Sequence, residues 1–203
     1  MSRQLLKYGF LPENKCAFFL CDLQENFRKA VIYFDNIVDS ANKLVKTSKI
    51  LNIPLVVTEQ YPKGLGRTVQ ELDISHAVGV YPKTRFSMLE PQVVNHLGSL
   101  CSSQLECVVL FGIEAHVCIE QTAAELSARG IQVHVVADAC SSRSQEDRLL
   151  AFQRLKQIGC FITTTENVIF KLIKDKEHPK FGDVRLLIKT PTPETGLMYF
   201  SKM

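Results

Sequence analysis

The sequence has no apolar run approaching the roughly 18 residues that a membrane-spanning helix needs. It has no block of lysine and arginine, and a net charge of +3 is too small to indicate a nucleic-acid partner. No linker and no internal repeat divides the 203 residues, a length that fits one domain. We therefore expect a single domain over residues 1–203, with neither a membrane nor a nucleic acid as its partner.

The seven cysteines also lack the C-x-x-C spacing of many metal and redox sites. The start, MSRQLLKYGF, has no apolar core of the kind found in secretory signal peptides. We therefore expect reduced thiols in a reducing compartment. The cytoplasm is the first expectation, and the mitochondrion is the alternative because these ten residues include basic side chains and no acid.

Apolar runs alternate with amphipathic segments along the chain, and this alternation is typical of α/β folds. Six strands are predicted, at Cys16–Asp22, Pro54–Thr58, Val80–Thr84, Leu105–Phe111, Ile131–Val136 and Gly159–Thr163. Helices are predicted at Tyr33–Leu51, Pro91–Leu100, His116–Arg129, Gln145–Ile158, Glu166–Lys174 and Asp183–Ile188. Gln60–Gly79 is expected to be a long loop, and the tail beyond Pro191 to be irregular. The pattern predicts a three-layer αβα sandwich with a six-stranded, mainly parallel sheet of order 3-2-1-4-5-6.

That strand order places the first and fourth strands side by side, and ligands bind at the carboxyl ends of strands where the order reverses. Asp22 ends the first strand, and the segment Gly112–Cys118 follows the fourth. We therefore expect Asp22 and Cys118 to converge, although they are far apart in the chain.

Cys118 follows a strand and a turn and opens a predicted helix, whose N-terminus favours a thiolate. This placement indicates a nucleophile, and the alternative is a small buried hydrophobe. Asp22 could be a general base or the N-cap of the segment Gln24–Arg28. Lys83 follows Pro82 in a short apolar strand, so its ammonium could face inward and hold nearby anions charged; the alternative is a solvated surface lysine.

Three motifs combine these residues: Cys21–Phe27 (CDLQENF), Lys83–Ser87 (KTRFS) and Gly112–Ile119 (GIEAHVCI), with Thr122 following. Together they resemble the isochorismatase-like cysteine hydrolases, which include nicotinamidases, N-carbamoylsarcosine amidase and bacterial isochorismatases. Within that family the chain looks most like the animal isochorismatase domain-containing proteins. The resemblance extends over about residues 14–190.

The resemblance implies a catalytic triad of Asp22, Lys83 and Cys118. It also implies a non-proline cis peptide at Ile113–Glu114, with the amides of Glu114 and Cys118 forming an oxyanion hole. Glu114 departs from the small residue often found there, which leaves the shape and charge of the pocket open.

The nicotinamidases of this family hold a metal with an Asp-x-His sequence after the second strand. Gln60 and Pro62 stand at the matching positions. Proline has no ligating side chain and an amide is a poor transition-metal ligand, so we expect no metal and no other cofactor.

We therefore expect hydrolysis of a small amide, or a related C–N bond, through a covalent thioester on Cys118. A vinyl-ether hydrolase of the isochorismatase type and a non-catalytic binding or scaffold protein are the alternatives. His116 is disfavoured as the base because residues two apart on a helix or turn do not face each other. The resemblance also suggests a homo-oligomer. The expected walls of the substrate pocket are Phe27, Gln60, Tyr61 and Phe86.

Overall fold

The computed structural model describes residues 8–197, so most of the segment used to judge targeting lies outside the described residues. Six strands form one sheet of order β3-β2-β1-β4-β5-β6, and every neighbouring pair is parallel. The strands are β1 (Cys16–Cys21), β2 (Leu55–Gln60), β3 (Gly79–Lys83), β4 (Cys107–Ile113), β5 (Gln132–Ser141) and β6 (Phe161–Thr163). The predicted fold class and strand order are confirmed.

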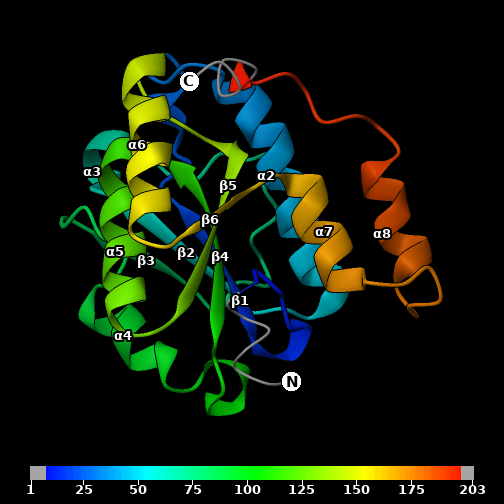
Figure 1. The fold of residues 1–203 in the computed structure, drawn as a ribbon. Helices are drawn as coiled ribbons and strands as arrows, with labels where there is room; N and C mark the ends of the chain where they lie inside the picture. Colours follow the sequence, from blue (N-terminus) through cyan, green and yellow to red (C-terminus); the bar gives the residue numbers. More distant parts are fainter. Residues whose placement is uncertain (1–7, 198–203) are drawn as a thin grey trace.

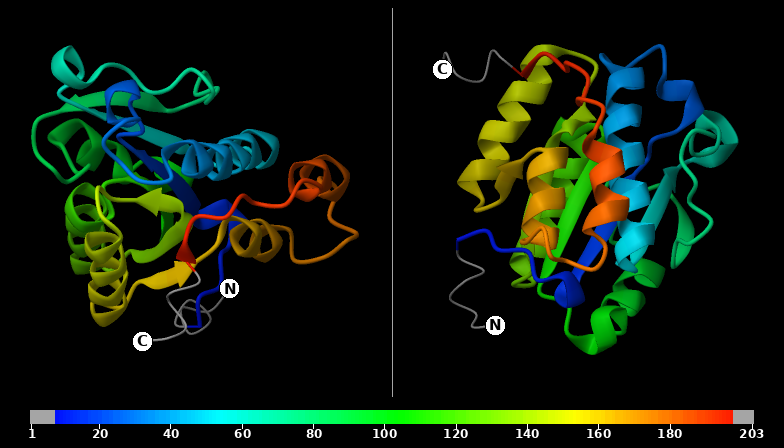
Figure 2. Two further views of the ribbon diagram at one scale, coloured as in Figure 1. Left: turned by 90° about the horizontal axis from the view of Figure 1, so that it is seen from above. Right: turned by 90° about the vertical axis from the view of Figure 1, so that its right-hand side faces the viewer.

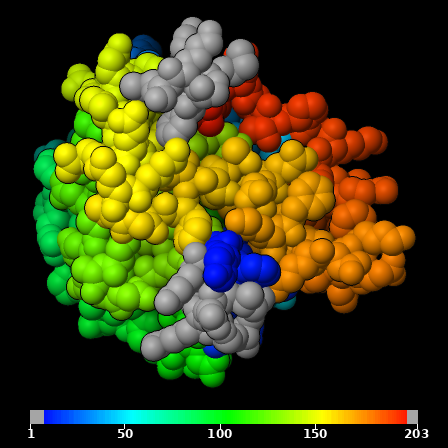
Figure 3. Space-filling view, in the orientation of Figure 1, coloured from blue at the N-terminus to red at the C-terminus, as the bar shows by residue number. Residues whose placement is uncertain are grey.

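Helices cover both faces of the sheet and complete the three layers. Helices α5 and α6 lie on one side and α2 and α7 on the other, with α8 beyond α2 and α7 (Figures 1 and 2). Figure 3 shows α7 and α8 as the orange and red part of the surface on that second side. The α-helices are α2 (Phe34–Leu51), α3 (Pro62–Leu65), α4 (Pro91–Leu97), α5 (Glu120–Ala128), α6 (Gln145–Gln157), α7 (Thr165–Ile173) and α8 (Phe181–Ile188). Short 3-10 turns are η1 (Glu13–Lys15), η2 (Glu25–Phe27) and η3 (Leu100–Ser103), and η4 (Ala115–Ile119) is a π-helical turn.

The core is continuous and centres on β1 and β4, whose residues are all buried. This burial explains their unbroken apolar sequences, because a central parallel strand has helices on both faces. Helix α2 packs through Ile37, Ala41, Leu44 and Val45, which recur at helical spacing. Among the described residues, no helix has the length and apolar character to cross a membrane.

Some element boundaries differ from the predicted ones. Strand β5 runs to Ser141, five residues past Val136, and includes a buried acid, Asp138. That carboxylate accepts hydrogen bonds from the backbone N–H and the hydroxyl of Thr165, so the strand can bury it. The predicted loop Gln60–Gly79 contains the short helix α3, which begins at Pro62. The predicted helix at His116 begins instead as η4 and continues as α5.

Candidate active site

The site begins where β1 ends. Asp22 directly follows β1 and has a left-handed backbone, with φ +49°. Its carboxylate is 1% exposed; Oδ1 accepts a hydrogen bond of 2.8 Å from the Thr58 hydroxyl, and Oδ2 lies 2.7 Å from Lys83 Nζ. The Cys21 thiol donates to the same Oδ2 at 3.4 Å. Asp22 is thus held on both oxygens, and the interpretation of Asp22 as an N-cap is not favoured because η2 has no side-chain cap.

Lys83 ends β3, and its side chain is fully buried. Its ammonium lies 2.7 Å from Asp22 Oδ2 and 3.6 Å from Cys118 Sγ. The backbone carbonyls of Arg85 and Phe86 accept at 3.1 and 2.9 Å. Burial acts to lower the pKa of Lys83, but the charges of Cys21, Asp22 and Cys118 outweigh it and raise the pKa above its ordinary value. The structure therefore places a charged ammonium between a carboxylate and a thiol.

Gln60, at the end of β2, holds that ammonium in place. Its Oε1 accepts from Lys83 Nζ at 2.6 Å, and its Nε2 donates to the Thr84 carbonyl at 2.9 Å. The buried Gln24 fixes Gln60 in turn, because its side chain bonds both the N–H and the C=O of Gln60. The amide expected in the pocket wall therefore contacts Lys83.

Cys118 lies in the π-helical turn η4, between β4 and α5. Such turns are rare and often occur at functional sites. The residue is 6% exposed, so its environment is nearly closed to solvent. Thr122 donates to the Cys118 carbonyl at 2.6 Å and accepts from the Met88 N–H at 2.9 Å. Thr122 thus ties the turn that carries the thiol to the segment that follows Lys83.

Gly112 allows β4 to approach β1 at this edge. Its φ is +123°, and a Cβ there would lie 2.0 Å from the carbonyl oxygen of Cys21. The peptide bond between Ile113 and Glu114 is cis, at the position that the family resemblance implies. Glu114 Oε1 is buried and has no hydrogen-bond partner among residues 8–197. Only glycine fits position 112, because any side chain would meet backbone rather than a movable group.

The expected wall residues lie around this cluster with different exposure. Tyr61 is 56% exposed, and it lines a cavity of about 410 Å³ together with Lys83 and Glu90. Phe86, 51% exposed, follows Lys83 by three residues, and Phe27 is half-buried in η2. Tyr61 is therefore the one expected wall residue of these three that lines the cavity, and Asp22 and Cys118 are not part of its lining.

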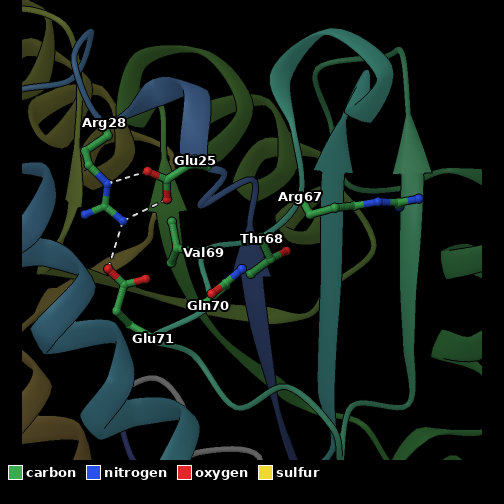
Figure 4. A pocket seen from close by; sticks show the side chains of 7 residues that line it. All are labelled: Glu25, Arg28, Arg67, Thr68, Val69, Gln70 and Glu71. Carbon is green, nitrogen blue, oxygen red and sulfur yellow. Dashed lines mark hydrogen bonds and ion pairs between the residues drawn. The ribbon is translucent and has the colours of Figure 1, made fainter.

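A cavity of about 690 Å³ lies elsewhere, and none of the triad residues lines it (Figure 4). Arg28 bonds Glu25 and Glu71 across it, while Arg67 extends away from the other six side chains toward β2. Glu25, Arg28 and Glu71 are already paired with one another, and Arg67 pairs with Glu59, which does not line this cavity. The smaller cavity, in contrast, borders Lys83.

The histidines do not join the cluster. His116 bonds the Ser142 hydroxyl at 2.9 Å, and His76 bonds Ser48 at 2.8 Å. The positioning roles of Gln24, Thr58 and Thr122 were not predicted from the sequence. Thr58 could have been found, because it is the last residue of the predicted second strand, which lies beside the first in the predicted order; the structure pairs it with Cys21.

The residues at the nicotinamidase metal positions do not fit a metal. Both polar atoms of the Gln60 side chain are engaged by Lys83 and Thr84, and Pro62 offers no side-chain donor. The ammonium of Lys83, 2.6 Å from Gln60 Oε1, would also repel a cation there. We derive no step through a metal.

A six-stranded parallel sheet of this order, with its polar cluster at the reversal between β1 and β4, defines an α/β protein of the isochorismatase-like hydrolase class. The comparisons agree, since the Isochorismatase domain model matches residues 16–167. The chain belongs to the isochorismatase family.

Curated relatives and a solved structure support this assignment over nearly the whole chain. Isochorismatase domain-containing protein 1 of Danio rerio is 50% identical over 190 residues, 94% of this chain and 66% of its own length. Isochorismatase domain-containing protein 2 of Homo sapiens is 48% identical over 192 residues, 94% of this chain and 91% of its own length. The structure described as MAR1 ribonuclease from Caenorhabditis elegans has a TM-score of 0.87 at 44% identity, covering 93% of this chain and 96% of that one. This chain therefore spans slightly under two thirds of the Danio rerio relative.

Two more distant structures share the fold alone. The YcaC gene product of Escherichia coli, described as an octameric hydrolase of unknown specificity, has a TM-score of 0.75 at 22% identity, covering 88% of this chain and 94% of that one. The pyrazinamidase of Pyrococcus horikoshii in complex with zinc has a TM-score of 0.65 at 20% identity, covering 74% of this chain and 99% of that one.

Proposed function

We propose that this protein, as one domain, hydrolyses a small amide or a related C–N bond through a covalent thioester on Cys118. The observation that carries the proposal is the position of Lys83 Nζ, 2.7 Å from Asp22 and 3.6 Å from Cys118, with all three side chains buried. A lone cysteine would be explained as packing. A thiol that shares a buried cation with a carboxylate has the partners that a nucleophile needs.

The two steps of the proposed reaction, formation of the thioester and its hydrolysis, follow from these contacts. Asp22 takes the proton of the Cys118 thiol, whose Sγ lies within 4.8 Å of the carboxylate, while Lys83 stabilises the thiolate. The sulfur attacks the carbonyl carbon, and the amides of Glu114 and Cys118 bind the resulting oxyanion. Asp22 then protonates the leaving nitrogen and a C–N bond breaks. Water hydrolyses the thioester and returns the thiol, so no metal or other cofactor is needed.

The size and lining of the site limit the substrate. The cavity beside Lys83 is about 410 Å³, which suits a small molecule. Tyr61, which lines this cavity, would contact the apolar part of the substrate. We also propose a homo-oligomer, by analogy with the octameric YcaC structure.

The alternative functions predict different chemistry or a different substrate. A vinyl-ether hydrolase would use acid chemistry and would not need Cys118, and a binding protein would release no product. The C. elegans relative is named a ribonuclease, and RNA is the substrate that tests that activity.

The test is a screen of small primary amides for ammonia release, with single-stranded RNA as a parallel substrate. Cys118→Ala is expected to abolish ammonia release, and Cys160→Ala to retain it. Cys160 is the matched control because it is 7% exposed, close to the 6% of Cys118, and is not part of the cluster. An acyl adduct on Cys118, seen by intact mass, would support the thioester. Amide turnover that survives Cys118→Ala, or RNA cleavage in place of amide turnover, would refute the proposal.

A further inference from the structure

A second thiol lies beside the proposed nucleophile. Cys21 Sγ, Cys118 Sγ and a carboxylate oxygen of Asp22 all lie within 4.8 Å of one another. Cys21 is the last residue of β1 and has no exposed surface, whereas Cys118 is 6% exposed. The proposed hydrolysis uses Asp22 and Cys118 and gives Cys21 no part.

The arrangement of charges favours sulfur chemistry over metal binding at these three groups. Lys83 Nζ is already 2.7 Å from Asp22 Oδ2, and a metal ion held by the same oxygen and the two sulfurs would face that ammonium. The cation instead stabilises a thiolate at Cys118, and a thiolate is the form that peroxides oxidise.

A second cysteine cluster, at the other end of the same strands, gives an internal contrast. Cys16 pairs with Cys107 in the register of β1 and β4, and Cys101 donates to the Cys16 carbonyl at 3.3 Å. Burial raises the pKa of Cys16 well above its ordinary value, and Cys107 adds to this. Cys16 and Cys107 are fully buried, and neither is among the thiols next to Lys83. Proximity of thiols is therefore common to both clusters, and Cys101 in the second cluster is even more exposed than Cys118. The difference is the ammonium of Lys83, which lies 3.6 Å from Cys118 Sγ.

We propose that Cys118 and Cys21 form a reversible oxidation site, in which a hydroperoxide oxidises Cys118 and Cys21 closes a disulfide with it. This inference rests on the proposed nucleophile. In the first step the Cys118 thiolate attacks the outer oxygen of the hydroperoxide, the O–O bond breaks, and Cys118 becomes a sulfenic acid. The departing alkoxide or hydroxide takes the proton that Asp22 accepted from the Cys118 thiol and leaves as an alcohol or water. In the second step Cys21 sulfur attacks Cys118 sulfur, the S–O bond breaks, and the two protons and the oxygen leave as water.

Cys21 is suited to the second step and not to the first. Burial raises the pKa of the Cys21 thiol well above its ordinary value, and the neighbouring Cys118 and Asp22 add to this, so Cys21 stays protonated while Cys118 reacts. Its thiol already donates to Asp22 Oδ2 at 3.4 Å, so the carboxylate can accept the proton as the S–S bond forms. Because Cys21 has no exposed surface, the sulfenic acid of Cys118 is the electrophile placed to reach it.

Closing the disulfide requires the sulfur atoms to approach to about 2.0 Å. Cys21 pairs with Gly112 across the β1–β4 register, and Cys118 follows Gly112 by one short π-helical turn. The movement therefore falls on the side chain of Cys118 and on η4, while β1 stays in the sheet. The resulting disulfide would block hydrolysis and protect Cys118 from irreversible oxidation.

The test treats the whole protein with one equivalent of hydrogen peroxide, blocks remaining thiols and maps disulfides by mass spectrometry. Chymotrypsin and a protease that cuts after glutamate are needed together. Cleavage at Phe19 separates Cys16 from Cys21, cleavage at Glu106 separates Cys101 from Cys107, and cleavage at Glu114 separates Cys107 from Cys118. A Cys21–Cys118 peptide that disappears on reduction with dithiothreitol is expected, with no Cys16–Cys107 peptide. In Cys21→Ala, dimedone should label Cys118, and the sulfinic acid should accumulate.

The outcomes separate this inference from the proposed hydrolase. If dimedone labels Cys118 in the unaltered protein and no Cys21–Cys118 peptide forms, the activated thiol stands and the oxidation site is refuted. If Cys118 is oxidised no faster than Cys101, the oxidation site and the nucleophile are both refuted. A Cys16–Cys107 disulfide formed at the same rate would show that proximity alone decides, which also refutes the inference.

Discussion

Replacing Lys83 with methionine tests whether the buried ion pair organises this site. Lys83 and Asp22 have exposed fractions of 0% and 1% and lie 2.7 Å apart, so water cannot replace the ammonium once it is removed. Breaking such a pair by removing one partner costs about 3–5 kcal/mol, because the other charge is left buried and unpaired. Gln60 Oε1 and the carbonyls of Arg85 and Phe86 lose the same donor. We therefore expect the free energy of unfolding of Lys83→Met to fall by about 3–5 kcal/mol.

The double variant Asp22→Asn/Lys83→Met separates the charge from the packing. The double variant removes the uncompensated carboxylate. In the unaltered protein the Thr58 hydroxyl donates to Asp22 at 2.8 Å, and the amide oxygen of the asparagine can still accept that hydrogen bond. We expect it to be more stable than Lys83→Met by at least about 2 kcal/mol, since a buried pair replaced as a whole costs much less than one that is broken. Neither variant should retain fast alkylation of Cys118.

Urea unfolding at pH 7 gives the free energies, and iodoacetamide labelling gives the reactivity. Lys49→Met is the matched control, because Lys49 also lies 2.7 Å from a carboxylate, that of Asp73, with both side chains more than half exposed. Screening by water makes that pair contribute little. The reasoning is refuted if Lys83→Met is as stable as Lys49→Met, or if the double variant is no more stable than the single one.

Three further substitutions probe the scaffold and the site. Gly112→Ala should lower the free energy of unfolding in urea by more than about 4 kcal/mol or prevent folding, because its Cβ would meet the Cys21 carbonyl at 2.0 Å. Gly182→Ala is the control and should be tolerated, because a Cβ there meets nothing within 4 Å. Equal stability of the two variants would contradict this reasoning. Burial lowers the pKa of His134 from 6.5 to about 3, so the unfolded chain gains a proton that the fold excludes. The neutral His134 therefore contributes its full share to the free energy of unfolding above pH 6.5. This share is lost as the pH falls towards 3, by about 2 kcal/mol at pH 5. His134→Phe should flatten the acid side of a stability–pH profile, and an unchanged slope would count against this assignment. Gln60→Leu should slow alkylation of Cys118 by loosening Lys83, whereas Gln70→Leu, at an exposed glutamine, should leave the rate unchanged; identical rates would remove Gln60 from the site.

The sequence was sufficient for the fold and for the meeting of distant residues. Buried parallel strands read as continuous apolar runs, and β1 and β4 are of this kind. Once the strand order is given, the end of β1 and the segment after β4 must be neighbours. Asp22 and Cys118 could therefore be placed together from the sequence. Lys83 needed the family motif, because one lysine after a proline carries little information.

The details that sequence could not supply depend on contacts made in three dimensions. Asp138 lies inside β5 because Thr165, from α7, satisfies its carboxylate, and nothing near Asp138 in the chain indicates that partner. Gln60 was expected to line the substrate pocket. A polar side chain at the end of a strand is equally consistent with contacting substrate and with holding a neighbouring side chain in place. Its contact with Lys83 depends on the pairing of β2 with β3, where Gln60 and Lys83 are register partners.

The surroundings of Lys83 explain how one cation could serve both steps of the proposed reaction. An ammonium has three N–H groups, and five acceptors lie around this one, of which Cys118 Sγ at 3.6 Å is the most distant. Conversion of the thiolate to a thioester would weaken that one contact and leave four. Gln60 and the two carbonyls are uncharged and do not change during the reaction, so Lys83 stays beside Asp22 while the charge on sulfur appears and disappears. A cation held only by the two reacting groups would move as the charge on sulfur changed.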